Sequence, residues 1–256
     1  MPVVLAGSYT TGLVIMAFAV IAIGESFPSA GSAAYGAAAG LAGIVGLGAF
    51  YRALAIGTMS IVAPISATGV AIPVIVGLVQ GEDPSLVTSA GLVLAVAGVV
   101  LASRESRPDD APEIDESARR QSIVLALVAG AAFGTYFTFA DLASEESVTW
   151  ALFLSRAVST PVLLVVVLLA VGAASVPRSA PVLAPLVAIG VLDLCANALY
   201  NVATTKGDLS GVAVAAALYP VVTVLLAAAV LHERVRGSQA VGVAAALAGV
   251  VMIAAG

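Results

Sequence analysis

Charge is scarce in this chain. Only 10% of its 256 residues are charged, and it contains one lysine, one histidine and one cysteine. A soluble domain carries roughly a quarter charged residues, so the polar surface here is too small to cover a globule in water. The single cysteine, Cys195, excludes an internal disulfide. The shortage of charge therefore excludes a water-soluble protein and indicates that lipid surrounds most of the chain.

Apolar residues take the place of charge. The hydrophobic fraction is 61% and the mean hydropathy is +1.12. Backbone in lipid must satisfy its own hydrogen bonds, which leaves helices or a closed barrel. Barrel strands alternate in segments of about 10 residues, whereas a spanning helix needs a continuous apolar run of about 20. The runs here have the second length. We predict an all-α, polytopic bundle of about nine transmembrane helices, at 3–23, 33–55, 60–80, 86–103, 121–142, 149–172, 182–204, 210–231 and 238–255.

One segment has the opposite composition. Residues 104–120 hold four arginines, six acidic residues and two prolines, and nothing apolar enough to insert into lipid. We predict a solvated linker, which divides the chain into residues 1–103 and 121–256.

The two parts repeat each other. The stretch Gly69–Val100 matches Pro220–Val251, within the segment Tyr219–Val251, at a fixed offset, and upstream Tyr51 matches Tyr200 with a slip of two residues. The matched motif residues are Glu82 with Glu233, Gly91 with Gly242, and Gly98 with Gly249. A hydrophobic unit used twice is typical of membrane transporters. Four predicted helices precede the linker and five follow it. The simplest interpretation is a five-helix repeat used twice, without the first helix of the first copy. Either the design is four plus five, or the start codon is assigned too late.

An odd number of helices per repeat inverts one copy relative to the other. The loop after the sixth predicted helix carries Arg178, and the loop after the eighth carries Arg234 and Arg236, whereas the matching loops 24–32 and 80–85 have no basic residue. Inverted copies that obey the positive-inside rule show this opposite bias. The basic side, with the linker, is predicted to be cytoplasmic, which places the C-terminus outside.

These features resemble a known family. Pro220 lies thirteen residues before Glu233, and a polar turn and two glycines seven residues apart follow. This pattern resembles the closing motif of the EamA-type branch of the drug/metabolite transporter superfamily, and the echo around Glu82 resembles the same motif in the first EamA repeat. There are three departures: the family usually has ten helices, Gly69 stands where the second copy has Pro220, and ten-helix members are drawn with both termini cytoplasmic.

The resemblance implies a function. Members are secondary exporters of small metabolites, with amino acids and related compounds as usual substrates and with no obligatory cofactor. We therefore expect a multi-pass protein of the plasma or inner membrane, whose partners are the lipid bilayer and a small polar metabolite, without cofactor, metal or nucleic acid. The alternative is a non-transporting sensor or assembly subunit of the same fold. An intramembrane enzyme is not expected, because the sequence has no HExxH or GxGD pair and His232 is its only histidine.

Ionisable groups inside a membrane helix are costly and are functional candidates by default. Arg156 and Asp193 lie deep in their predicted helices, so we expect them to pair, whereas Asp141 is close to a helix end. Asp193, Asn197 and Asn201 follow one another at intervals of four and form one stripe of a helix. Such a stripe suits a polar or zwitterionic substrate. It equally fits an interhelical hydrogen-bond seam, worth about 0.6 kcal/mol per contact.

The other candidates are tyrosines and motif residues. The predicted cavity tyrosines are Tyr51, Tyr136, Tyr200 and Tyr219. Pro220 is a candidate gating kink, because it breaks the backbone hydrogen-bond ladder. Glu82 and Glu233 sit in polar turns and are predicted to be structural. The glycines Gly91, Gly98, Gly242 and Gly249 allow close helix packing, within one chain or between the protomers of a homodimer.

Overall fold

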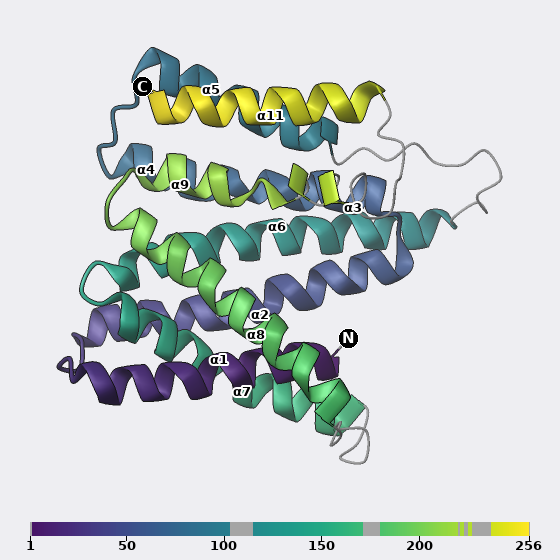
Figure 1. Cartoon of the computed structure of the whole chain (residues 1–256). Helices are drawn as coiled ribbons and strands as arrows, with labels where there is room; N and C mark the ends of the chain where they lie inside the picture. The colour runs from purple at the N-terminus through teal and green to yellow at the C-terminus, as the bar shows by residue number, and fades with distance from the viewer. Residues whose placement is uncertain are drawn as a thin grey trace. The chain divides into compact units, whose positions relative to one another are not determined.

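The structure is a computed structural model that describes residues 2–102, 115–170, 180–219, 221–222, 225–226 and 237–255. Every regular element in these ranges is helical. The elements are α1 (Pro2–Ile23), α2 (Ala30–Ile56), α3 (Met59–Ala67), the 3₁₀ turn η1 (Thr68–Val70), α4 (Ala71–Val79), α5 (Leu86–Ala102), α6 (Glu116–Ser144), α7 (Val148–Ala170), α8 (Ala180–Thr204), α9 (Leu209–Ala216) and α11 (Gly237–Ala255). Figure 1 shows this order from purple to yellow. The predicted all-α bundle is confirmed.

Seven helices within the described ranges are long and apolar enough to cross a membrane, and α5 is a shorter apolar helix. α5 has 17 residues, the lower limit for a spanning helix. The predicted helix at 210–231 lies only partly within the described residues. The predicted linker lies mostly outside them, because the structure describes only residues 115–120 of it. The protein is an integral membrane protein.

The third predicted helix is broken. Residues 59–79 form α3 and α4, with η1 between them. Pro73 has no N–H group to donate to the carbonyl of Gly69, so the backbone ladder cannot continue unchanged through this point. A short 3₁₀ turn absorbs the break.

The chain forms two compact units. The first contains Met1–Ile44 and Tyr136–Lys206, and the second contains Val45–Thr135 and Gly207–Gly256. Each unit therefore combines segments from both sides of the linker. This division follows spatial contacts and differs from the predicted division into repeats 1–103 and 121–256, which stays a prediction.

In the first unit, α1 packs against α7 and α8 (Figure 1). Met16 of α1, Leu152 of α7 and Leu194 of α8 form a buried apolar cluster. α1 and α7 run antiparallel, because Gly12 meets Arg156 while Thr160 donates a hydrogen bond to the carbonyl of Tyr9 at 3.3 Å. This packing places the ring of Tyr9 and the side chain of Arg156 together at the contact between α1 and α7.

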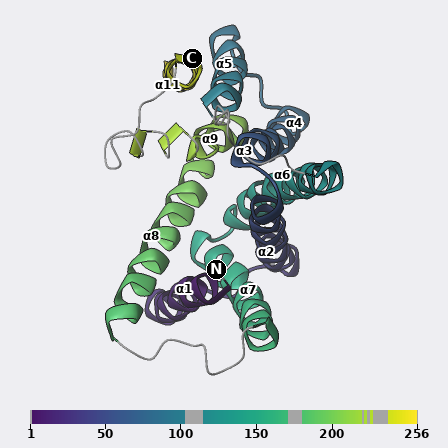
Figure 2. The same cartoon turned by 90° about the vertical axis from the view of Figure 1, so that its right-hand side faces the viewer.

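In the second unit, α5 packs along α11, and α4 packs against α9 (Figure 2). The α5–α11 seam is made of glycines. A Cβ on Gly91 would lie 2.7 Å from the carbonyl oxygen of Gly249, and a Cβ on Gly98 would lie 2.7 Å from that of Gly242. Contacts this short require glycine on both helices. The two helices are antiparallel, because the lower number on one meets the higher number on the other.

Candidate functional site

The first unit holds a buried ion pair. Nη2 of Arg156, on α7, lies 2.6 Å from Oδ2 of Asp193, on α8. The prediction that these two residues pair is confirmed by this geometry. The side chain of Arg156 is only 4% exposed, whereas that of Asp193 is 37% exposed. The carboxylate is therefore the accessible member of the pair, and the guanidinium is the buried one.

α1 encloses the guanidinium. The Cζ atom of Arg156 lies 4.3 Å from the centre of the Tyr9 ring, which places the cation over the aromatic face. A Cβ on Gly12 would lie 3.0 Å from Nε of Arg156, so the absence of a side chain at Gly12 makes room for the arginine. This Nε atom is buried and has no hydrogen-bond partner among the described residues. The guanidinium is thus held by the ring of Tyr9 and by one carboxylate.

Two neutral polar side chains extend the network. Nδ2 of Asn197 donates to the backbone oxygen of Asp193 at 2.7 Å and to its Oδ1 at 3.3 Å. The hydroxyl of Tyr136, on α6, donates to Oδ1 of Asn197. Helical spacing explains the first contacts, because residues four apart share one face. A cation, a carboxylate, an amide and a phenol therefore meet in one place, with contributions from α1, α6, α7 and α8.

The last residue of the predicted stripe, Asn201, and its neighbour Tyr200 are less available. The hydroxyl of Tyr200 donates to the backbone oxygen of Phe137 at 3.0 Å, and its ring lies 4.8 Å from that of Phe137. This contact joins α8 to α6. Asn201 is 2% exposed, and its side-chain oxygen has no hydrogen-bond partner in the part of the chain that the structure describes. Both belong to the first unit, but no hydrogen bond within the described ranges joins either side chain to the ion pair.

The other predicted cavity residues lie elsewhere. Tyr51 and Tyr219 belong to the second unit, where Tyr51 packs against Phe50 and Tyr219 interacts with Ser66. Their assignment to a cavity with Asp193 stays a prediction. Pro220, the candidate gating kink, and Glu233 lie outside the described residues.

Glu82 caps a helix of the other half of the chain. Its carboxylate oxygens lie 3.3 and 3.4 Å from the backbone nitrogen of Ser210, at the start of α9. Asp208 occupies the N-cap position, but its side chain makes no capping hydrogen bond. The carboxylate of Glu82 rests against Gly77, where a Cβ would collide with it. An acidic group at a helix N-terminus stabilises unsatisfied N–H groups, which is a structural role.

Sequence reasoning did not single out two residues of the network. Tyr9 stands among several hydroxyl residues of the first predicted helix, and Gly12 is one of 25 glycines. Tyr9 and Gly12 are three residues apart, which places them on one face of a helix. This shared face was the signal in the sequence that could have linked them. Only the packing of α1 on α7 shows which arginine they enclose.

The network provides hydrogen-bond donors, acceptors and both signs of charge in an apolar surrounding. No group of three or more His, Cys, Asp or Glu side chains that could hold a metal ion is found within the described ranges. Fold and site together define a polytopic membrane protein with a polar side-chain network between helices of its first unit.

The comparisons with known proteins identify the family. The EamA-like transporter family matches residues 120–255, which is more than half of the chain and corresponds to the predicted second repeat. The chain belongs to the EamA-like transporter family, which is a family of membrane transporters of the drug/metabolite type. No match was found among curated proteins.

A solved structure described only as a crystal structure of a protein shares the fold. Its TM-score is 0.75 at 16% sequence identity, and the alignment covers 99% of this chain and 88% of that chain. The fold is therefore one that is already known for a chain of similar length.

Proposed function

We propose that this protein is a secondary exporter of small polar metabolites, such as amino acids or related compounds, in the plasma or inner membrane. The observation that carries the proposal is the Arg156–Asp193 pair with Asn197, Tyr136 and Tyr9 around it. A spanning helix has little reason to keep a charge unless that charge is paired or faces a water-filled path. Here the carboxylate is more than a third exposed.

The chemistry of the network favours a zwitterionic solute. The half-exposed carboxylate of Asp193 suits a substrate ammonium group, and the hydroxyl of Tyr136 and the amide of Asn197 suit its polar atoms. Arg156 is too buried to receive a substrate directly, so its role is to balance and orient Asp193. We assign substrate contact to Asp193, Asn197 and Tyr136, and positioning to Arg156 and Tyr9.

We further propose alternating access between two inverted repeats. The contacts of the glycine seam support this mechanism. The repeat matches Gly91 with Gly242 and Gly98 with Gly249, and the seam brings Gly91 to Gly249 and Gly98 to Gly242. If each glycine is replaced by its match, the contact of Gly91 with Gly249 becomes the contact of Gly242 with Gly98. A two-fold axis produces this relation. A two-fold axis across an antiparallel pair relates copies of opposite orientation.

The decisive experiment is a screen for metabolites that accumulate outside cells overexpressing the protein. Asp193→Asn is expected to abolish that accumulation while the amount of protein in the membrane stays unchanged. Asp208→Asn is the matched control, because it also removes one carboxylate but lies in an exposed turn. Normal export by the Asp193→Asn variant would show that the ion pair is only a structural lock between α7 and α8.

The second candidate is a non-transporting sensor or assembly subunit. It fits if the ion pair only locks α7 to α8 and contacts no substrate. Reconstitution in liposomes separates the two candidates, because a sensor moves no solute. We propose no enzymatic activity, since the family is one of transporters. A homodimer would use a face other than the glycine seam, because α5 and α11 bury that seam within one chain.

A further inference from the structure

The charges of the proposed site balance each other. Among the described parts of the spanning helices, Arg156 and Asp193 are the ionisable acid and base that lie far from the helix ends. Arg52 and Asp141 lie within about one turn of the ends of α2 and α6. One positive and one negative group in contact leave the empty site with no net charge.

The pair is also confined to one compact unit. Arg156, Asp193 and the enclosing residues Tyr9 and Gly12 all belong to the first unit. α1 packs on both α7 and α8, the helices that carry the two charges. Both charges also lie in the predicted repeat 121–256, so a movement between the two repeats does not require the ion pair to separate. The neutral state persists while the site changes its access.

We infer that the transporter works without a coupling ion: its empty site returns as a neutral pair, and it carries a zwitterion electroneutrally. This inference rests on the proposed function. A single uncompensated charge that crosses a potential of about 100 mV changes an equilibrium by up to about 50-fold. A neutral site is not affected by the membrane potential, either when it moves with the zwitterion bound or when it returns empty. Neither a proton nor a metal cation is therefore required to neutralise the site.

The test uses full-length protein in proteoliposomes and a radiolabelled mixture of neutral amino acids as the probe. Initial uptake is measured under a potassium-diffusion potential of either sign, under a pH gradient of either sign, and with no gradient. We expect the initial rates to agree within about two-fold across these conditions. A rate that requires the pH gradient, or that changes about ten-fold with the sign of the potential, would overturn the inference while leaving the transport function intact.

Charge variants sharpen the result. Arg156→Gln and Asp193→Asn leave one uncompensated charge, so any uptake that they retain should depend on the potential. The double variant Arg156→Gln/Asp193→Asn and the conservative Arg156→Lys keep the site neutral, so their uptake should not. Asp208→Asn is the control for a charge lost outside the helices. Potential-dependent uptake by the double variant or by Arg156→Lys would contradict the inference.

If the single variants are inactive, the uptake rates of the wild type alone test the inference. Equal wild-type rates under both signs of the potential support the inference. No uptake of any amino acid by correctly folded wild-type protein, in any of these conditions, would overturn both the proposed function and the inference.

Discussion

The environment of Arg156 is set by its neighbours on α1 as much as by its charged partner. Asp193 provides the opposite charge, but Gly12 provides the space and Tyr9 the aromatic face. Breaking a buried ion pair by removing one partner typically costs about 3–5 kcal/mol, because the remaining charge is left uncompensated. A substitution that merely displaces the arginine should therefore affect the site strongly.

Gly12→Ala is expected to lower transport several-fold. Its Cβ would lie 3.0 Å from Nε and 3.5 Å from Cδ of Arg156, so the guanidinium must shift by a few tenths of an ångström from its position against Asp193 and Tyr9 or the helices must move apart. Gly48→Ala is the control, since a Cβ there meets nothing within 4 Å. Both changes raise helix propensity, by about 1 kcal/mol. Initial uptake rates in proteoliposomes measure the effect, and equal rates for the two variants would contradict the enclosure of Arg156 by α1.

At the scale of elements, small residues decide which helices can pair. α5 and α11 approach closely because glycines face each other along the seam. Around this seam, buried residues such as Val99, Val221 and Ala246 complete the core of the second unit. In lipid the hydrophobic effect does not drive such pairing, so close van der Waals contact must provide the stability.

Gly98→Ala is expected to destabilise the second unit by about 1–3 kcal/mol, the usual cost of overpacking. Its Cβ would collide with the backbone of α11 near Ala246. Gly237→Ala, at the start of α11, is the matched control, because a Cβ there has open space around it. Thermal denaturation in detergent compares the two variants. An unchanged midpoint for Gly98→Ala would mean that α5 and α11 do not pack through their glycines.

The loops of the first unit are joined by two glutamates. Glu146 accepts hydrogen bonds from the hydroxyl and the backbone nitrogen of Ser29, at 2.5 and 2.8 Å. Glu25 accepts one from the hydroxyl of Ser147, which itself accepts from the backbone nitrogen of Trp150 at 3.1 Å. The indole of Trp150 donates to the backbone oxygen of Glu25 at 3.3 Å. The only tryptophan of the chain therefore reports on this loop contact.

The contact should weaken in acid. The side-chain and backbone hydrogen bonds of Ser29 hold the pKa of Glu146 below its ordinary value of 4.5. The carboxylate therefore contributes stability above the unfolded pKa, and this contribution is lost as pH falls through the lower folded pKa. We expect Trp150 fluorescence to change in that acid range. Glu146→Gln should remove this transition, and Glu145→Gln, an exposed neighbour, should keep it. An identical acid transition in the Glu146→Gln variant would contradict the assignment.

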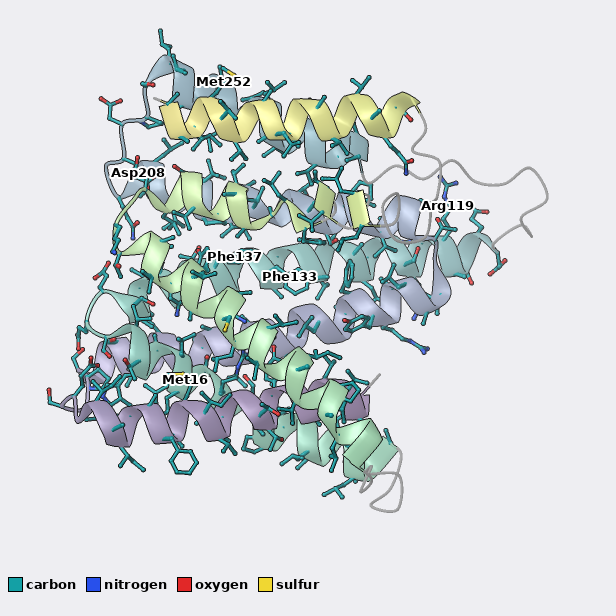
Figure 3. The ribbon with its side chains drawn as sticks, in the orientation of Figure 1. Met16, Arg119, Phe133, Phe137, Asp208 and Met252 are labelled. Carbon is teal, nitrogen blue, oxygen red and sulfur yellow. The ribbon has the colours of Figure 1, made fainter. Side chains whose placement is uncertain are left out.

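At the scale of the whole molecule, the order of the helices sets the sidedness of the loops. Within the second unit, Asp83 and Asp208 line one cavity of about 440 Å³ together with Thr88 and Ile253. Arg119 lies at the opposite end of the helices of this unit (Figure 3). Two loops from different halves of the chain therefore open on one side, and the end of the linker lies on the other.

Cysteine labelling tests this arrangement. In a Cys195→Ser background, Asp83→Cys and Asp208→Cys should react with a membrane-impermeant maleimide on intact cells, and Arg119→Cys should react only after permeabilisation. The direction follows from the basic residues near the linker, which favour the cytoplasm. The reverse pattern would invert the orientation. Labelling of Asp83→Cys and Asp208→Cys from different sides would contradict the fold of the second unit.

The sequence alone is sufficient for the class, the helices and the family. Long apolar runs, scarce charge and a repeated glutamate–glycine motif require no knowledge of packing, because a bilayer constrains backbone hydrogen bonding within each helix separately. Arg156 and Asp193 are recognisable for the same reason, since a charge inside an apolar run needs a partner. The break at η1 was harder to predict from the sequence. Pro64 and Pro73 mark a weak point in the helix, but they do not determine how the backbone responds.

The partners of each side chain depend on tertiary packing. The stripe of Asp193, Asn197 and Asn201 is visible in the sequence, yet its members differ: Asp193 and Asn197 join the ion pair, while Asn201 is buried apart from it. Tyr9 and Gly12 belong to the site only because α1 packs on α7 at Arg156. The hydroxyl of Tyr200 is already hydrogen-bonded, because α6 presents the carbonyl of Phe137 to it. Helical periodicity specifies which residues share a face, but the neighbour of that face is specified by contacts between segments far apart in the chain.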